Sequence, residues 1–312
     1  MPLKSPSNPR FQHSLLALLL LAASGCTSSS SRITPRSVPT SERVTYTDAI
    51  GRQVELPRMP ARIISLAPSV TEILYLVGAG DRVAGVTVYC DWPEDARKKP
   101  KIGDLLNPNA ELILAARPDL VIASTAGNDR TAVLKLADLG LPVFVTAPRT
   151  VETILETVEQ MGRITGCEVK ADELVARMKA RLEHLDRRLK GTKRLRAFYI
   201  TWFEPLLAPG KGTFENDLLR HAGVDSITAT IPEFYPRYSL EQVIASDPDV
   251  ILAVRHEGNP LPDLKSLRGW RQLRAVRQNK VFIVSEMLQH PSPRFLDALE
   301  DLAGRLHPET FR

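Results

Sequence analysis

The sequence has few of the residues from which disulfide frameworks and metal centres are built. Its 312 residues include three cysteines and six histidines. Cys90 and Cys167 fall in different predicted elements, so we expect two free thiols, and a disulfide between them is the alternative for an exported protein. Two thiols are too few for a cysteine metal site, and no two histidines stand at ligand spacing on one element. The sequence therefore predicts no metal centre.

Motifs typical of enzymes and of nucleic-acid-binding proteins are also missing. No Ser-His-Asp order and no paired carboxylates stand in a context that suits catalysis. Gly78, Gly80 and Gly85 end a predicted helix instead of opening one after a strand, which argues against a dinucleotide loop. The net charge is a modest +5. The basic stretch 177–196 is typical of the solvent-exposed face of a helix, so we expect neither an enzyme nor a nucleic-acid partner.

No apolar run is long enough to cross a bilayer, which takes about 20 residues. Residues 15–23 form an apolar run of about nine residues behind Lys4 and Arg10, which is typical of a secretion signal. The segment from Ala23 to Cys26 resembles a lipobox, although Ala23 stands where an aliphatic residue such as Leu is usual. We expect a lipoprotein signal peptide at 1–25, a lipidated Cys26 and a flexible tether at 26–43, with simple secretion as the alternative.

The chain contains one internal repeat. Residues 109–123 return as residues 239–253, so the second copy begins 130 positions after the first. Each copy reads as a helix start, a short amphipathic helix, a Pro-Asp turn and a buried strand. So large an offset does not suit a solenoid and indicates two similar lobes. Small ligands commonly bind in clefts between such lobes.

The predicted strands alternate with helices, which is typical of parallel βαβ units. We expect an α/β fold of two parallel-sheet lobes, at 44–150 and 194–312, joined by linking helices at 151–193. Outside the repeat, the first lobe should contain a hairpin at 44–57, strands at 62–67, 82–88 and 142–146, and a helix at 129–139. The second should contain strands at 196–201 and 280–284, a helix at 213–222 and a final helix from about residue 294.

Two local patterns make sharper predictions. Ser69 and Glu72 stand three residues apart at the start of an expected helix, which predicts a capping box. Helical patterns at 151–165 and 168–189 are separated at Gly166. On the second, apolar residues three or four apart predict one continuous stripe, formed by Leu174, Met178, Leu182, Leu185 and Leu189. We interpret this second helix as the single long rigid link between the lobes.

Several segments together resemble one protein family. They lie, in order, at residues 62–74, 85–93, 101–103, 117–122, 209–213, 239–244 and 292–294. They resemble the helical-backbone (class III) substrate-binding proteins of ABC importers for cobalamin, siderophores and haem, and most of all the cobalamin-binding branch. The likeness covers about residues 44–307. It implies two α/β lobes bridged by one long helix, a small-molecule ligand and no catalytic cofactor. It also implies a membrane permease with its ATPase as partners, and we expect the protein to be a monomer.

The resemblance implies two kinds of site. Glu111 and Glu241 match the exposed glutamates, one on each lobe, that meet permease arginines in the family. Charges on separate lobes would make a two-point docking contact, although a Glu in a first helical turn is also stabilised by the helix dipole. The ligand-binding candidates are Tyr89, Trp92, Trp202, Phe203, Tyr235, Glu286 and His290. For the aromatic side chains the alternative role is core packing. His290 is also a candidate axial ligand to a bound cobalt or haem iron.

Some positions depart from the cobalamin-binding pattern. Leu105, Ser124, Thr201 and Met287 stand where large aromatic side chains are usual, which reduces the area available to stack on a flat ring. We expect capture of cobalamin or a related corrinoid, and a ferric siderophore or haem is the close alternative. A basic cleft with Arg149, Arg237 or Arg255 facing the ligand would favour an anionic siderophore. A tetrapyrrole metal chelatase and an adaptor that binds no nutrient are the alternatives of a different class.

Overall fold

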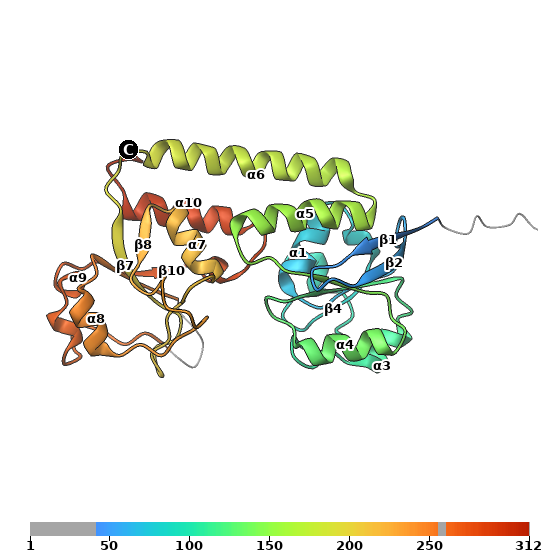
Figure 1. Cartoon of the computed structure of the whole chain (residues 1–312), viewed down its shortest axis with the longest axis horizontal. Coiled ribbons are helices and arrows are strands. Elements are labelled where there is room, and N and C mark those ends of the chain that lie inside the picture. Colours follow the sequence, from blue (N-terminus) through green and yellow to red (C-terminus); the bar gives the residue numbers. More distant parts are fainter. Residues whose placement is uncertain (1–41, 255–259, 312) are drawn as a thin grey trace, which may run out of the picture. The chain divides into compact units, whose positions relative to one another are not determined.

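The computed structural model describes residues 42–254 and 260–311, and all of them belong to one compact unit (Figure 1). The expected signal peptide, the lipidated Cys26 and Arg255 lie outside the described residues. Among the helices that the structure describes, none is both long and apolar enough to span a bilayer.

The first lobe contains a four-stranded parallel sheet in the order β4-β3-β5-β6. Its strands are β3 (Ile63–Ser65), β4 (Val83–Val86), β5 (Leu120–Ser124) and β6 (Val143–Thr146). Its helices are α1 (Pro68–Leu76), η1 (Gly80–Arg82), α2 (Glu94–Arg97), α3 (Ala110–Ala115) and α4 (Arg130–Asp138). An antiparallel hairpin of β1 (Arg43–Thr47) and β2 (Gln53–Pro57) precedes the sheet. The strands and the hairpin agree with those predicted for the first lobe, whereas α2 lies where no helix was predicted.

The second lobe also contains four parallel strands, in the order β10-β9-β7-β8. They are β7 (Leu195–Ile200), β8 (Val224–Ser226), β9 (Val250–Val254) and β10 (Val281–Val284). The helices are α7 (Phe214–His221), α8 (Leu240–Ser246), η2 (Trp270–Gln272), α9 (Arg274–Arg277), η3 (Glu286–Gln289) and α10 (Phe295–Leu306). Sequence analysis missed β8 and α9 because elements of three or four residues carry too little periodicity.

The internal repeat folds the same way in both lobes. Asn109 and Ser239 cap helices α3 and α8, each accepting a hydrogen bond from the backbone amide three residues on. The repeated aspartates join neighbouring strands. Asp119 accepts from the amides of Ala61 and Arg62 just before β3, and Asp249 accepts from the amide of Arg196 in β7. The aspartate of the Pro-Asp turn therefore helps to align β3 with β5 in the first lobe and β7 with β9 in the second.

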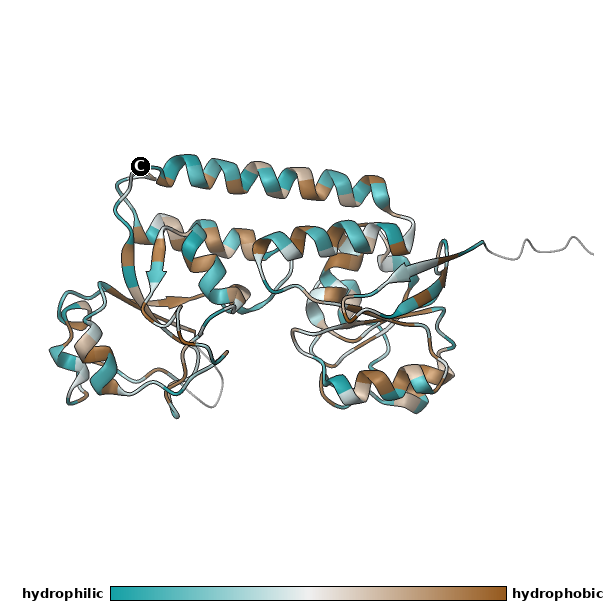
Figure 2. Cartoon of the chain, in the orientation of Figure 1, coloured by the Kyte–Doolittle hydropathy of each residue, from teal (hydrophilic) through white to brown (hydrophobic). Residues whose placement is uncertain are grey.

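Two long helices link the lobes. Helix α5 (Val151–Thr165) and helix α6 (Glu168–Leu189) pack side by side in opposite directions, and Gly166 makes the left-handed turn between them (Figure 1). A side chain at Gly162 would overlap Ala171, so the two backbones approach closely there. Figure 2 shows α6 as mainly hydrophilic with recurrent hydrophobic residues. Its buried residues include four of the predicted stripe, while Leu189 is half-buried.

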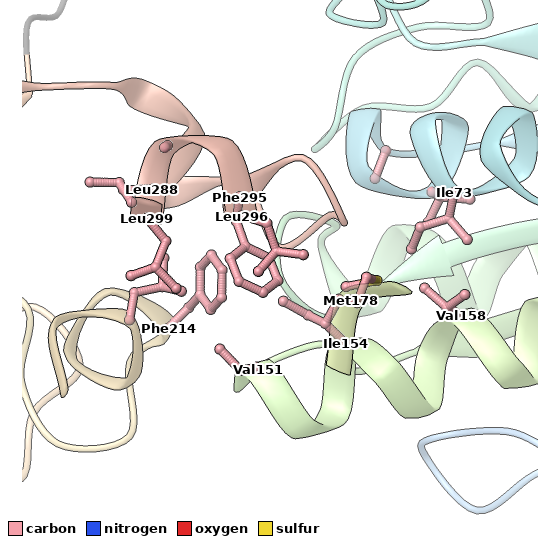
Figure 3. Packing of buried hydrophobic residues seen from close by; sticks show 14 of the residues in the cluster. Ile73, Val151, Ile154, Val158, Met178, Phe214, Leu288, Phe295, Leu296 and Leu299 are labelled. Carbon is pink, nitrogen blue, oxygen red and sulfur yellow. The ribbon is translucent and has the colours of Figure 1, made fainter. Parts of the chain in front are cut away.

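One apolar core runs through both lobes. It joins alternate residues of the two sheets to helices α1, α5, α6, α7 and α10. Figure 3 shows Ile73 and Val158 continuing through Val151 and Ile154 to the packed ring of Phe295. The opposite face of each sheet has a smaller core of its own. Because the lobes share an interior, separating them would expose buried apolar surface. The free-energy cost would be about 25 cal/mol for each Å² exposed.

The predicted capping box is wrong. The N-cap of α1 is Ala67, and no side chain caps the helix. Pro68 occupies the first helical turn, where it has no amide to satisfy, so the helix needs less capping there. Glu72 is 2% exposed and faces the second lobe. Its carboxylate accepts hydrogen bonds from the Ser292 hydroxyl and the Arg294 guanidinium, the latter at 3.0 Å.

Arg294, from the second lobe, contacts the first lobe a second time. Its guanidinium lies over the Trp92 ring, 4.6 Å from the ring centre. The salt bridge to Glu72 is well shielded on the Glu72 side and partly open on the Arg294 side. We call Glu72, Trp92, Ser292 and Arg294 the lobe junction. Hydrogen bonds to a buried carboxylate are strong and directional, so this junction orients the lobes as well as joining them.

We expect Arg294→Met to lower the free energy of unfolding by about 3 kcal/mol, because it leaves the Glu72 carboxylate buried without its counter-charge. Adding Glu72→Gln should recover part of that loss. The measurement is chemical denaturation followed by tryptophan fluorescence. The control is Arg43→Met, which breaks the exposed Arg43–Glu55 pair and should cost about 0–1 kcal/mol. Equal effects of the two arginine variants would contradict the structural role of the junction.

Candidate functional site

Three adjoining cavities lie between the lobes, with volumes of about 280, 250 and 590 Å³. We call them together the groove. Its first-lobe walls come from loops that follow strands β3, β4, β5 and β6, and its second-lobe walls from α7, the loop after β8 and the segment after β10. Loops at the carboxyl ends of parallel strands are where α/β proteins usually bind ligands. The topology thus gathers these loops at one place.

The largest cavity has Tyr89 on the first-lobe side and Glu286 with His290 on the second-lobe side. Tyr89 is 57% exposed although it is a large aromatic residue, so its ring is free to contact a ligand. Leu105 and Met287 complete an apolar wall in the same cavity. Together these residues offer a flat ring surface, two aliphatic contacts and a polar rim.

His290 lines two of the three cavities. Its Nδ1 atom is buried and has no hydrogen-bond partner among the described residues. No group of three or more metal-binding side chains occurs in the described part of the chain. A single imidazole nitrogen does not hold a free metal ion, but it suits one open coordination position of a metal chelate.

Tyr235 lines the cavity of about 280 Å³, on its second-lobe side, and is 47% exposed. Its hydroxyl donates a hydrogen bond of 3.1 Å to Glu215, a carboxyl that is 3% exposed in the first turn of α7. Burial raises the pKa of Glu215, and burial together with the Glu215 carboxyl raises the pKa of the Tyr235 phenol. The Tyr235 ring is therefore held at a fixed angle and stays neutral.

Glu215 was missed by the sequence analysis. Its position in the first turn of a helix resembles an ordinary contact with the helix dipole, and nothing in the sequence showed that it is buried. The hydroxyl of Tyr199, whose pKa is also raised by burial, lies buried without a partner in the described residues, as does Oε2 of Glu215. These groups form a polar layer behind the aromatic wall.

Arg149 and Phe234 meet across the groove. The guanidinium of Arg149, from the first lobe, lies 5.4 Å from the ring centre of Phe234 in the second lobe. Both residues line the cavity that contains Tyr235. Of the other basic residues considered from the sequence, Arg237 is exposed and is not among the residues that line the groove. Among the described residues, Arg149 is therefore the arginine that lines the groove.

Three aromatic candidates have other surroundings. Trp92 packs under Arg294 in the lobe junction. Phe203 packs in the second-lobe core, 5.7 Å from the ring of Trp270. The Trp202 indole donates to the carbonyl of Glu204. None of the three is among the residues that line the groove. The position of these residues in loops did not show which stacking partners and backbone contacts hold them.

The positions that depart from the cobalamin-binding pattern are mostly in the walls. Leu105, Ser124 and Met287 line the groove, whereas Thr201 does not. Side chains that are not aromatic leave more room at these positions but offer less surface for stacking. The exposed aromatic surface of the groove thus comes mainly from Tyr89, Phe234 and Tyr235.

Glu111 and Glu241 are exposed in the first turns of α3 and α8, at equivalent places in their lobes. Hydrogen bonds from its own amide and from the Ser239 hydroxyl lower the pKa of Glu241. Exposed aliphatic side chains adjoin each carboxylate, Leu112 and Leu114 on α3 and Ile244 on α8. Charged residues beside exposed aliphatic residues are suited to a protein interface.

Comparisons with known proteins agree with this geometry. A family model described as periplasmic binding protein matches residues 63–287. The ABC transporter substrate-binding lipoprotein YvrC of Bacillus subtilis, itself uncharacterized, is 30% identical over 277 residues, 86% of this chain and 87% of its own. A vitamin B12-binding protein of Vibrio parahaemolyticus is 30% identical over 240 residues, 76% of this chain and 86% of its own.

A solved structure extends the likeness to three dimensions. The periplasmic vitamin B12 binding protein BtuF of Vibrio cholerae superimposes with a TM-score of 0.72 at 29% identity, covering 81% of this chain and 99% of that one. The span matched by the family model includes both sheets, the linking helices and the groove residues other than Gln289, His290 and Pro291. From its sequence, its two parallel-sheet lobes and its linking helices, the chain belongs to the periplasmic binding protein family.

Proposed function

We propose that this protein is the substrate-binding component of an ABC importer and that it captures cobalamin or a related corrinoid in the groove. The observation that supports this most is the pair of exposed tyrosines, Tyr89 and Tyr235, on opposite walls of one groove. A corrin ring is large, flat and partly apolar, so aromatic walls suit it. Relatives named for vitamin B12 support the same ligand.

The polar residues of the groove fit the rest of such a ligand. The free Nδ1 of His290 would face the metal or a polar substituent of the ring, and Glu286 would accept hydrogen bonds from amide groups at its rim. Arg149 at the wall favours a second candidate, a haem or ferric siderophore with anionic groups. The two candidates differ in charge, so they can be separated by titration.

Delivery requires a second surface. Under this proposal Glu111 and Glu241 would contact arginines of the permease, one from each lobe. Because the two glutamates occupy equivalent places in the two lobes, the permease could contact both lobes at once. A signal peptide at 1–25, a lipid on Cys26 and a tether at 26–43 would direct export of the chain and hold its lobes at a membrane. The Bacillus subtilis relative is likewise named a lipoprotein.

We expect the soluble chain from residue 42 onward to bind cyanocobalamin with a saturable one-to-one stoichiometry. Tyr89→Ala and Tyr235→Ala should each weaken binding about tenfold, because each removes one stacked ring. The measurement is isothermal titration calorimetry. Val88→Ala is the matched control, since Val88 adjoins Tyr89, is also exposed and does not line the groove.

Haem and a ferric siderophore should be titrated beside cyanocobalamin. Tight binding of one of these and none of cyanocobalamin would move the ligand to the other branch. Chemical conversion of a tetrapyrrole by the pure protein, followed by its absorbance spectrum, would favour the chelatase alternative.

We expect Glu111→Lys with Glu241→Lys to abolish ligand uptake in vesicles that contain the cognate permease and ATPase, because both docking charges would then repel the permease arginines. Ligand affinity measured by calorimetry should not change, since both residues lie outside the groove. The control is Glu156→Lys on α5, which reverses one exposed charge away from the repeat. Normal uptake by the double variant would contradict the docking role.

A further inference from the structure

A fourth cavity, of about 470 Å³, opens within the first lobe at the ends of strands β5 and β6. We call it the side chamber. Its apolar walls are Ile50, Ala123, Val133 and Val145, and its polar walls are Ser124, Thr125, Asn128, Arg130 and Arg149. Of the residues considered from the sequence, Ser124 and Arg149 line it, whereas the aromatic candidates, Glu286 and His290 do not. The side chamber therefore needs an explanation of its own.

The charge of the side chamber is one-sided. Arg130 and Arg149 line it, and its lining contains no Asp or Glu. Within the described part of the chain, neither arginine forms a salt bridge, unlike Arg52 with Asp48 or Arg294 with Glu72. Both residues are exposed, so their guanidinium groups are accessible to an anion that enters the chamber. Arginine is also the side chain that best matches carboxylate and phosphate oxygens in pairs.

Hydroxyl groups add donors to the same space. The Thr125 Oγ1 atom is buried and has no partner among the described residues. The Ser124 hydroxyl accepts from the amide of Ala126, which leaves its own proton free to donate. Asn128 offers nothing more, because its amide group already bonds to backbone at both ends. The free polar groups of the chamber can therefore all donate a hydrogen bond to an anion.

The nearest acidic side chain in the sequence does not cancel this charge. Asp129 accepts a hydrogen bond from the amide of Ala132 and caps helix α4. It is absent from the residues that line the chamber. Asp48, in the loop beside Ile50, is bound by Arg52 and by the amide of its own turn. Both carboxylates are therefore already hydrogen-bonded to groups close to them in the sequence.

The side chamber adjoins the groove. Thr125 and Arg149 line the chamber and also the groove cavity that Tyr235 lines. Ser124 lines the chamber and also the groove cavity of about 250 Å³. Arg149 faces both spaces while it lies over Phe234. A substituent of a molecule held in the groove could thus extend past Arg149 toward Arg130.

We propose that the side chamber binds an oxyanion, either a phosphodiester or a carboxylate, that belongs to the molecule held in the groove. Arg130 and Arg149 would clamp its oxygens, and the hydroxyls of Ser124 and Thr125 would donate to them. The inference rests on the proposed function only in that the groove holds a ligand. It adds a chemical requirement, a negatively charged substituent beside the flat ring.

The test compares ligands with and without the anionic group. Cyanocobalamin carries a phosphodiester, together with the ribose and base attached to it, that cobinamide lacks. Haem carries two carboxylates that its dimethyl ester converts to neutral esters. For whichever pair binds, we expect Arg130→Gln to weaken binding of the anionic member about tenfold and Arg149→Gln to weaken it at least as much. Binding of the member without the anion should be weaker in the unmodified chain and should not respond to Arg130→Gln.

Arg271→Gln is the control, since it removes an exposed positive charge from the second lobe, outside the groove and the chamber. Retained affinity for the neutral member shows that each variant is folded. If neither pair distinguishes the arginine variants from the control, the oxyanion site is wrong. If only the haem pair binds and responds to Arg130→Gln, the corrinoid proposal fails while the oxyanion site stands.

Discussion

The carboxylate of Glu72 reaches from the first lobe into the second, and the positions of both groove walls depend on what it binds. Ser292 and Arg294 hold it, and Arg294 returns to the first lobe through the ring of Trp92. Around this polar contact the apolar core continues from one lobe to the other along α5 and α6. A buried ion pair adds orientation to the core, because an ill-placed charge there is costly.

A fixed junction explains how exposed aromatic residues can serve in binding. Tyr89 and Tyr235 lie in different lobes, and those lobes are joined by the lobe junction and the shared core. Tyr235 is further oriented by the buried carboxyl of Glu215. Walls that are already in place lose less entropy when a ligand binds than walls that must first assemble. Wide hinge closure is therefore not needed for capture.

Much of the fold could be predicted from the sequence because its signals are local. The repeat, the alternation of strands and helices and the turn at Gly166 each depend on a few neighbouring residues. The sequence was less informative where a distant partner decides the surroundings of a side chain. Glu72 has the spacing of a capping box but serves the other lobe, and Trp92 and Phe203 pack against residues far along the chain. Burial of Glu215 and the unpaired state of Arg130 likewise needed three dimensions.

The most direct test of this account is the distance between the lobes with and without ligand. Spin labels at Asp138 on α4 and at Gln278 after α9, both exposed, would report it by pulsed electron resonance in a chain that lacks other reactive thiols. We expect one narrow distance population that shifts by less than about 2 Å on adding cyanocobalamin. A broad distribution that narrows only with ligand, or a shift several times larger, would contradict the claim that the junction fixes the groove.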